Sequence, residues 1–231
     1  EVSDSIWQDI THVGCGANAF RRLVHQFVGR RAGGYVMTYS TLAPIVKYPF
    51  SSQHAGAHGK FGFFESEASS FQRIADELSL ICLSAPGEPL RYARHPLVYL
   101  MEAADDICYE IMDMEDAHKL KVLSFAETRD LLLGFFDERT KDEITARIEN
   151  EGISDENEQI VYMRARAINI LETECVKVFV DNEEAILQGT FSGSLVSHIG
   201  ERTKKAYERC VNVSMRKIYC SKPVLDIELS G

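Results

Sequence analysis

Apolar residues return every three or four positions along most of this chain, which is the spacing of one buried face on an α-helix. The clearest case is a run without helix breakers from Pro96 to Ala117, where the proline suits a first turn because its missing N–H would be unpaired there. The same spacing predicts a long helix from about Asp155 to Leu187, stopped by Gly189. The apolar positions that we expect to be buried in these two helices are Leu97, Leu100, Met101, Ala104, Ile107, Cys108 and Ile111, and then Ile160, Met163, Ala167, Ile170, Leu171, Cys175, Val178 and Phe179.

The remaining segments are also predicted to be mostly helical. Thr38 and Ser40 are candidate N-caps for one of the shorter helices. A stretch rich in Ser, Gly and His at 51–62 is predicted to be a loop near a site, and 84–89 contains two prolines that break the chain. We find no internal repeat and no linker, so residues 1–231 are expected to form a single all-α domain. The helices predicted here cover residues 18–28, 38–47, 65–80, 124–136, 141–149 and 191–220, with an alternating pattern at 224–229.

Composition narrows the class of protein. A chain of 231 residues with 45% hydrophobic and 26% charged residues is typical of a soluble globular protein with a substantial core. The formal net charge of −10 argues against a general nucleic-acid or membrane binder, although it leaves room for a local basic pocket. No apolar run approaches the roughly 18 residues of a membrane span. The six cysteines include no CxxC pair, which favours reduced thiols in a cytoplasmic protein over a structural zinc site.

Two carboxylates and a phenol share one face of the helix that begins near Pro96. Asp105, Tyr109 and Asp113 stand at i, i+4 and i+8, so they lie one above another. Polar groups beside apolar positions are costly to bury unless a metal, a cation or a ligand occupies them. An ordinary solvated stripe has the same spacing, so spacing alone leaves both interpretations open.

The residues themselves resemble a known family. The string RHPLVYLMEAADDICYEIMDMEDA, at 94–117, is similar to the C-terminal signature helix of the HD-domain deoxynucleoside triphosphate triphosphohydrolases, in particular the bacterial dGTPase-like branch. NAFR at 18–21, TYSTLAPIVKYP at 38–49 and KFGFF at 60–64 resemble further motifs of that family, in the same order. Together they cover most of residues 17–118. The resemblance implies an HD-domain-like helical bundle, here lacking its N-terminal catalytic helices, and a homo-oligomer, hexameric in many relatives.

The resemblance implies roles for the residues on the signature helix. Asp105 corresponds to the last of four metal ligands, the others being a histidine and an adjacent His-Asp pair, and hard cations such as Mg²⁺ or Mn²⁺ prefer carboxylate oxygens. Asp113 is implied to accept a hydrogen bond from the 3′-hydroxyl of the deoxyribose, with Tyr109 closing over the sugar. The ordinary alternatives are a surface aspartate for Asp105 and a half-buried core tyrosine for Tyr109.

Two lysines and a tyrosine are the expected phosphate contacts. Lys47, Tyr48 and Lys60 stand in the motifs IVKYPF and GKFGFF, and fixed ammonium groups offset the charge of a triphosphate in a partly desolvated pocket. Without the resemblance, both lysines would be interpreted as surface side chains whose stems lie on apolar neighbours. Arg30 and Arg31 are better explained as part of a solvated turn.

The chain also departs from the family pattern. It contains no His-Asp dipeptide, so the remaining metal ligands would precede residue 1, and the chain would be a C-terminal portion of the enzyme. Gly16 stands where the family has a phosphate-binding asparagine, and Asn18 replaces that contact only with a local shift. Residues 1–16 match poorly altogether. His54 and His58 have the spacing of a helical metal pair, but they lie in a Gly/Ser loop, which argues against it.

Three functions follow from these observations. The first is metal-dependent hydrolysis of dGTP, and of other dNTPs, to a deoxynucleoside and tripolyphosphate, with this chain inactive by itself for lack of metal ligands. The second is a non-catalytic dNTP-binding or oligomerisation module. The third is a helical interaction domain in which the motifs serve only packing.

Overall fold

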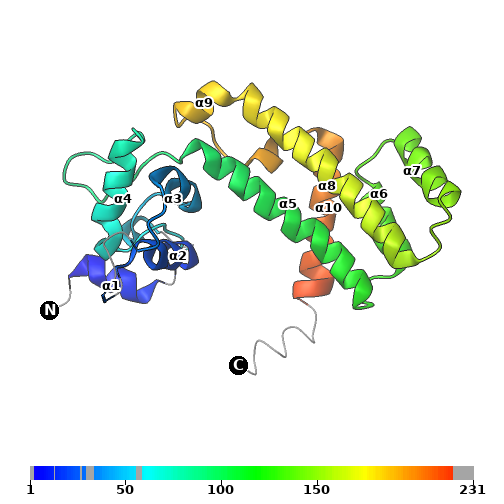
Figure 1. Cartoon of the computed structure of the whole chain (residues 1–231), viewed down its shortest axis with the longest axis horizontal. Coiled ribbons are helices and arrows are strands. Elements are labelled where there is room, and N and C mark those ends of the chain that lie inside the picture. The colour runs from blue at the N-terminus through cyan, green and yellow to red at the C-terminus, as the bar shows by residue number, and fades with distance from the viewer. Residues whose placement is uncertain (1–2, 13, 27, 30–33, 56–58, 221–231) are drawn as a thin grey trace. The chain divides into compact units, whose positions relative to one another are not determined.

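A computed structural model describes residues 3–12, 14–26, 28–29, 34–55 and 59–220. Within these ranges the chain is built from helices and carries isolated β-bridges but no strand, which confirms the all-α prediction (Figure 1). No helix in the described part is long and apolar enough to cross a membrane. The α-helices are α1 Asp4–Thr11, α2 Cys15–Val24, α3 Tyr39–Ile45, α4 Glu65–Glu77, α5 Pro96–Lys119, α6 Phe125–Leu133, α7 Glu138–Asn150, α8 Glu156–Asp181, α9 Glu183–Leu187 and α10 Glu201–Val213.

The helices gather into two compact units. The first unit comprises residues 1–102 and 182–192, and the second comprises 103–181 and 193–231. Short 3-10 turns at Ser52–His54 and Leu195–His198 and a π turn at Ser214–Tyr219 complete the regular structure. The single domain expected from the sequence stays a prediction, and each unit is described by itself.

An aromatic cluster holds the first unit together. Phe71 of α4 stacks on Phe63, with ring centroids 4.8 Å apart, and meets Phe20 of α2 edge-on at 5.7 Å. Helix α1, which the sequence analysis did not predict, joins this unit through Asp9. One carboxylate oxygen of Asp9 accepts a hydrogen bond from the backbone N–H of Glu65 at 2.8 Å, so this side chain satisfies an otherwise unpaired donor at the start of α4.

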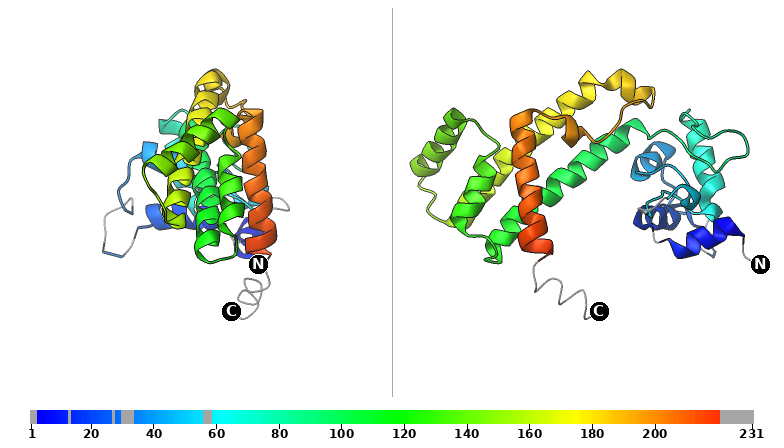
Figure 2. Two further views of the ribbon diagram at one scale, coloured as in Figure 1. Left: turned by 90° about the vertical axis from the view of Figure 1, so that its right-hand side faces the viewer. Right: turned by 180° about the vertical axis from the view of Figure 1, so that it is seen from behind.

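In the second unit α6 packs against α8 and against α10 (Figure 2). Ser124 begins α6 with a complete capping box, since its hydroxyl accepts from the N–H of Glu127 while the Glu127 carboxylate accepts from the N–H of Ser124. Glu115 of α5 is 5% exposed and is paired with Arg164 of α8 at 2.6 Å, which joins the two long helices.

The structure corrects several boundaries and burial predictions. The long helix expected over 155–187 is interrupted at Asn182, and 191–220 contains a 3-10 turn, α10 and a π turn instead of one helix. In α8 the predicted stripe is buried except for Ile170 and Phe179, which are intermediate. In α5 the stripe was largely wrong, because this helix has apolar residues on more than one side and a different side faces the core. Leu97, Met101, Ala104 and Cys108 are exposed, whereas Val98, Ala103, Ile107, Ile111 and Met114 are buried.

Some predictions fall outside the described residues. These are the solvated turn at Arg30 and Arg31, the histidine pair through its member His58, and the alternating pattern at 224–229.

Candidate functional site

Three segments of the first unit are held together by isolated bridges. Phe50 pairs with Arg91 in antiparallel fashion, and Ser51 pairs with Phe63 in parallel fashion. The N–H of Gly62 donates to the carbonyl of Phe50 at 3.0 Å. A Cβ at Gly62 would lie 2.1 Å from the carbonyl oxygen of Tyr48, so only glycine permits this approach. The bridges therefore bring residues 47–51, 60–64 and 90–94 to one place.

The expected phosphate contacts meet there. The Lys47 and Lys60 ammonium nitrogens lie 6.0 and 5.8 Å from the centre of the Tyr48 ring. Both distances are within the range in which a cation is attracted to an aromatic face. The structure thus gathers Lys47, Tyr48 and Lys60, which the sequence places up to 13 positions apart.

A buried carboxylate links one of these lysines to an arginine. Glu102 is 9% exposed, and its two oxygens accept from Lys47 Nζ at 2.9 Å and from an Arg94 guanidinium nitrogen at 2.6 Å. The Arg94 guanidinium also lies 4.4 Å from the centre of the Tyr99 ring. Two cations share one carboxylate, so this cluster keeps a net positive charge. Burial is the main cause that raises the pKa of Tyr99, so its phenol stays protonated and donates to the carbonyl of Phe191 at 3.1 Å.

A cavity of about 210 Å³ opens beside this cluster. Arg91 and Arg94 line it together with Lys47 and Tyr48, and the sequence analysis did not single out either arginine. The only indication in the sequence was that Arg94 is the first residue of the RHPL motif. Guanidinium groups bind phosphate oxygens through paired hydrogen bonds, so this lining suits a chain of phosphate groups.

Asn18 is not gathered with these residues by any contact in the described part of the chain. It is exposed on the first turn of α2, where its N–H donates to the carbonyl of Gly14 at 2.9 Å. The start of α2 packs against Phe61, because a Cβ at Gly14 would lie 2.8 Å from that ring. The start of α2 therefore lies against the segment that carries Lys60.

The other expected residues lie on α5, in the second unit. Asp105 is exposed and Tyr109 is 63% exposed, which argues against a half-buried core role for that tyrosine. Asp113 is partly buried, and one of its oxygens accepts a hydrogen bond from the Tyr219 hydroxyl at 2.5 Å. Among the described residues no three His, Cys, Asp or Glu side chains are placed to hold a metal ion.

Next to these residues, α5 turns two acidic positions toward α10. The Tyr207 hydroxyl donates to the backbone carbonyl of Asp106 at 3.4 Å, and the Ser214 hydroxyl donates to the Glu110 carboxylate at 3.0 Å. Burial raises the pKa of Glu110 because its charged form loses water. These contacts attach α10 to α5 and leave Asp105 and Tyr109 on the accessible side.

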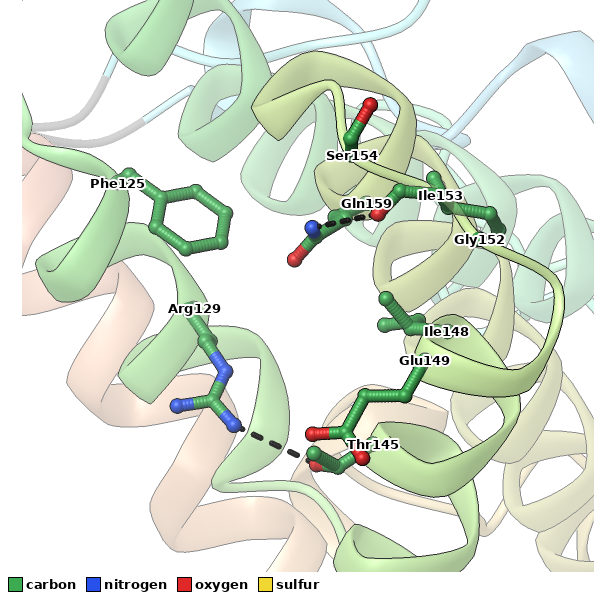
Figure 3. A pocket seen from close by; sticks show the side chains of 9 residues that line it. All are labelled: Phe125, Arg129, Thr145, Ile148, Glu149, Gly152, Ile153, Ser154 and Gln159. Atoms are coloured by element: carbon green, nitrogen blue, oxygen red, sulfur yellow. Dashed lines mark hydrogen bonds between the residues drawn. The ribbon is translucent and has the colours of Figure 1, made fainter.

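A cavity of about 400 Å³ in the second unit gathers none of the predicted residues (Figure 3). Its walls come from α6, α7 and the start of α8, and they mix one cation, Arg129, with one carboxylate, Glu149. The Arg129 guanidinium donates to the Thr145 hydroxyl at 3.4 Å, and the Gln159 amide donates to the carbonyl of Ile153 at 2.8 Å. The opposite charges and internal hydrogen bonds of this lining do not select one class of ligand.

Comparison with known proteins adds a relationship along nearly the whole chain. No family model matches. A deoxyguanosinetriphosphate triphosphohydrolase-like protein of Pseudomonas aeruginosa is 35% identical over 227 residues, which cover 96% of this chain and 49% of that protein. A protein of the same description from Synechocystis is 37% identical over 78% of this chain and 40% of its own length. A deoxyguanosinetriphosphate triphosphohydrolase of Salmonella paratyphi A is 27% identical over all of this chain and 46% of its own length. The chain thus spans about half the length of the curated relatives it matches.

Proposed function

The chain is a member, over the segment that aligns, of the deoxyguanosinetriphosphate triphosphohydrolase-like family, and from this premise we propose that it takes part in the hydrolysis of dGTP to deoxyguanosine and tripolyphosphate. In this proposal Lys47, Tyr48 and Lys60 bind phosphate groups, Asp105 binds one metal ion, and Tyr109 and Asp113 contact the deoxyribose. Other dNTPs share the same phosphates and deoxyribose, so they are possible substrates as well.

The observation that carries the proposal is a cavity lined by Lys47, Arg91 and Arg94. Lys60 lies next to this cavity, 5.8 Å from the centre of the Tyr48 ring that lines it. A triphosphate carries close to four negative charges, and preorganised cations stabilise such a group best where water is partly excluded. Glu102 balances part of this charge when no anion is bound and keeps Lys47 and Arg94 in place. Because the chain has a net charge of −10, a local cationic cluster on it suits a compact anion better than a long polyanion.

The residues of α5 supply the other contacts in this proposal. Asp105 offers an exposed carboxylate oxygen to a divalent cation, Mg²⁺ or Mn²⁺, which when bound would polarise a phosphate oxygen or activate water. The described residues form no group of three such side chains around it, so the proposal needs further ligands in addition to Asp105. Asp113 accepts from the 3′-hydroxyl, and Tyr109, exposed on the same face, covers the sugar ring.

The direct test is hydrolysis of dGTP with Mn²⁺, followed by detection of tripolyphosphate. We expect this chain to be inactive by itself and a longer form, matched to the full length of the relatives, to be active. Asp105→Ala in the longer form should then abolish activity, whereas Asp142→Ala, an exposed position on α7, should not. Hydrolysis that survives Asp105→Ala would contradict the role of that carboxylate.

A second candidate, a non-catalytic dNTP-binding or oligomerisation module, is favoured by the lack of a three-ligand metal group among the described residues. In this second function the cationic cavity binds the nucleotide, and no hydrolysis takes place. Binding of dGTP in the presence of a chelator, together with inactivity of the longer form, would support this second function. The molar mass of the chain with and without dGTP would show whether nucleotide binding drives a homo-oligomer.

A further inference from the structure

The π turn that continues α10 runs along the acidic face of α5 in the second unit. Three side chains of α10 and this turn reach α5 in order, and each contacts a position about one helical turn from the previous one. The pairs are Tyr207 with the Asp106 carbonyl at 3.4 Å, Ser214 with Glu110 at 3.0 Å and Tyr219 with Asp113 at 2.5 Å.

The last of these contacts depends on the π turn. The N–H of Cys220 donates to the carbonyl of Met215, five residues earlier, which widens the helix by one residue in this turn. A continued α-helix would rotate Tyr219 to a different direction relative to α5. The less common geometry therefore aims this phenol at Asp113.

The hydrogen bond from Tyr219 fixes the orientation of the Asp113 carboxylate and leaves acceptor positions on it for a ligand. The phenol donates to Oδ2, and a distance of 2.5 Å is typical of a hydroxyl bonded to an ionised carboxylate. A carboxylate has about four acceptor positions, so Oδ1 and the second lone pair of Oδ2 remain able to accept from a ligand hydroxyl. Tyr219 is 39% exposed, so the contact lies at the accessible surface and not inside the core.

The phenol stays a donor across the physiological range. The hydrogen bond to Asp113 is the main cause that raises the pKa of Tyr219, with burial and the nearby carboxylates acting in the same direction. The Tyr219 phenol therefore keeps its proton in this range and offers Asp113 a hydrogen bond of constant direction.

We propose that Tyr219 is a positioning residue, which fixes the Asp113 carboxylate so that its unoccupied lone pairs face the 3′-hydroxyl of the deoxyribose. The proposal rests on the proposed function, because it takes Asp113 as the sugar contact. It adds a residue from the π turn that follows α10, more than a hundred positions from Asp113 in the sequence.

The test compares the affinities for dGTP and for 2′,3′-dideoxyguanosine triphosphate, which differ only in the 3′-hydroxyl. We expect the wild-type chain to prefer dGTP, and Asp113→Asn to lose the preference. Tyr219→Phe, which keeps the ring and removes the donor, should reduce the preference by about three- to tenfold, since hydrogen bonds to charged groups are strongly directional. Tyr207→Phe removes a similar phenol that also bonds to α5, and it should leave the preference unchanged.

The results distinguish a failure of the positioning role of Tyr219 from a failure of the sugar contact of Asp113. A wild-type preference that Asp113→Asn abolishes and Tyr219→Phe leaves intact would overturn the positioning role while keeping the proposed sugar contact. No preference in the wild-type chain would remove the sugar contact itself and the positioning role with it. Equal losses in Tyr219→Phe and Tyr207→Phe would show a general effect of α10 packing and would also overturn the inference.

Discussion

Replacing Glu102 by glutamine removes the carboxylate that Lys47 and Arg94 share. The side chain of Glu102 is 11% exposed, and those of its partners are 29% and 21% exposed, so water screens these pairs only in part. Breaking a buried ion pair by removing one partner costs about 3–5 kcal/mol, because the remaining charge is poorly solvated. The partial exposure of both cations places the expected cost for Glu102→Gln near the lower end, at about 3 kcal/mol of unfolding free energy.

Urea denaturation of the wild-type chain and of Glu102→Gln measures this cost. The matched control is Glu143→Gln, which removes the partner of Arg139 in a pair whose side chains are 58% and 89% exposed. Exposed pairs of this kind contribute about 0.3–0.5 kcal/mol, so the control should change the unfolding free energy very little.

The same denaturation experiment with added inorganic tripolyphosphate tests whether the cluster binds this anion. A ligand that binds only the folded state raises its stability according to its concentration and affinity. In Glu102→Gln no carboxylate competes with the anion, so tripolyphosphate should stabilise the variant more than the wild-type chain. The reasoning is refuted if the variant loses less than about 1 kcal/mol, or if tripolyphosphate stabilises the wild-type chain equally well.

Three further predictions concern single positions. Gly62→Ala should unfold the first unit or abolish phosphate binding, because its Cβ would lie 2.1 Å from a backbone oxygen. The control Gly16→Ala, on α2, should be tolerated, because its Cβ would meet nothing closer than 3.8 Å. Melting temperatures of the two variants test both expectations. Hydrogen bonds to a lysine and to the cap of α6 lower the pKa of Glu127 from 4.5 to about 2. The contribution of this carboxylate to stability is therefore present above pH 4.5 and is lost as the pH falls through about 2. Glu127→Gln should flatten the pH dependence of the urea midpoint between these two pH values. Burial raises the pKa of Cys175 to about 11 and that of Cys210 to about 12, so both thiols should resist alkylation of the folded chain at pH 8, and mass spectrometry should find the label on the exposed cysteines Cys15, Cys82, Cys108 and Cys220.

The helices of the second unit illustrate what periodicity predicts and where it stops. In α8 most of the predicted stripe is buried. In α5 apolar residues occupy several sides, so spacing located the helix but chose Leu97 and Met101 as core positions, although both are exposed. Which side of such a helix is buried depends on the partners that pack against it, and those partners are distant in the sequence.

The basic cluster around Glu102 was likewise only partly predictable from the sequence. Lys47 and Lys60 stood out because they interrupt apolar and glycine-rich motifs. Arg91 and Glu102 carried no such signal, since their roles arise from bridges between segments 40 or more positions apart. The Tyr219 contact with Asp113 likewise needs a π turn, which no pattern in the sequence predicted.

We propose that the first unit binds the triphosphate part of a nucleotide through Lys47, Lys60 and Arg94. Isothermal titration of the chain with dGTP and with deoxyguanosine, in the presence of a chelator, tests it most directly. The account predicts binding of dGTP and much weaker binding of deoxyguanosine. Lys47→Ala and Lys60→Ala should each weaken dGTP binding, about tenfold for a lost charge-assisted contact of about 1.4 kcal/mol, while Lys177→Ala, on the exposed side of α8, should not. Equal affinity for the nucleotide and the nucleoside, or unchanged dGTP binding in both lysine variants, would contradict the claim.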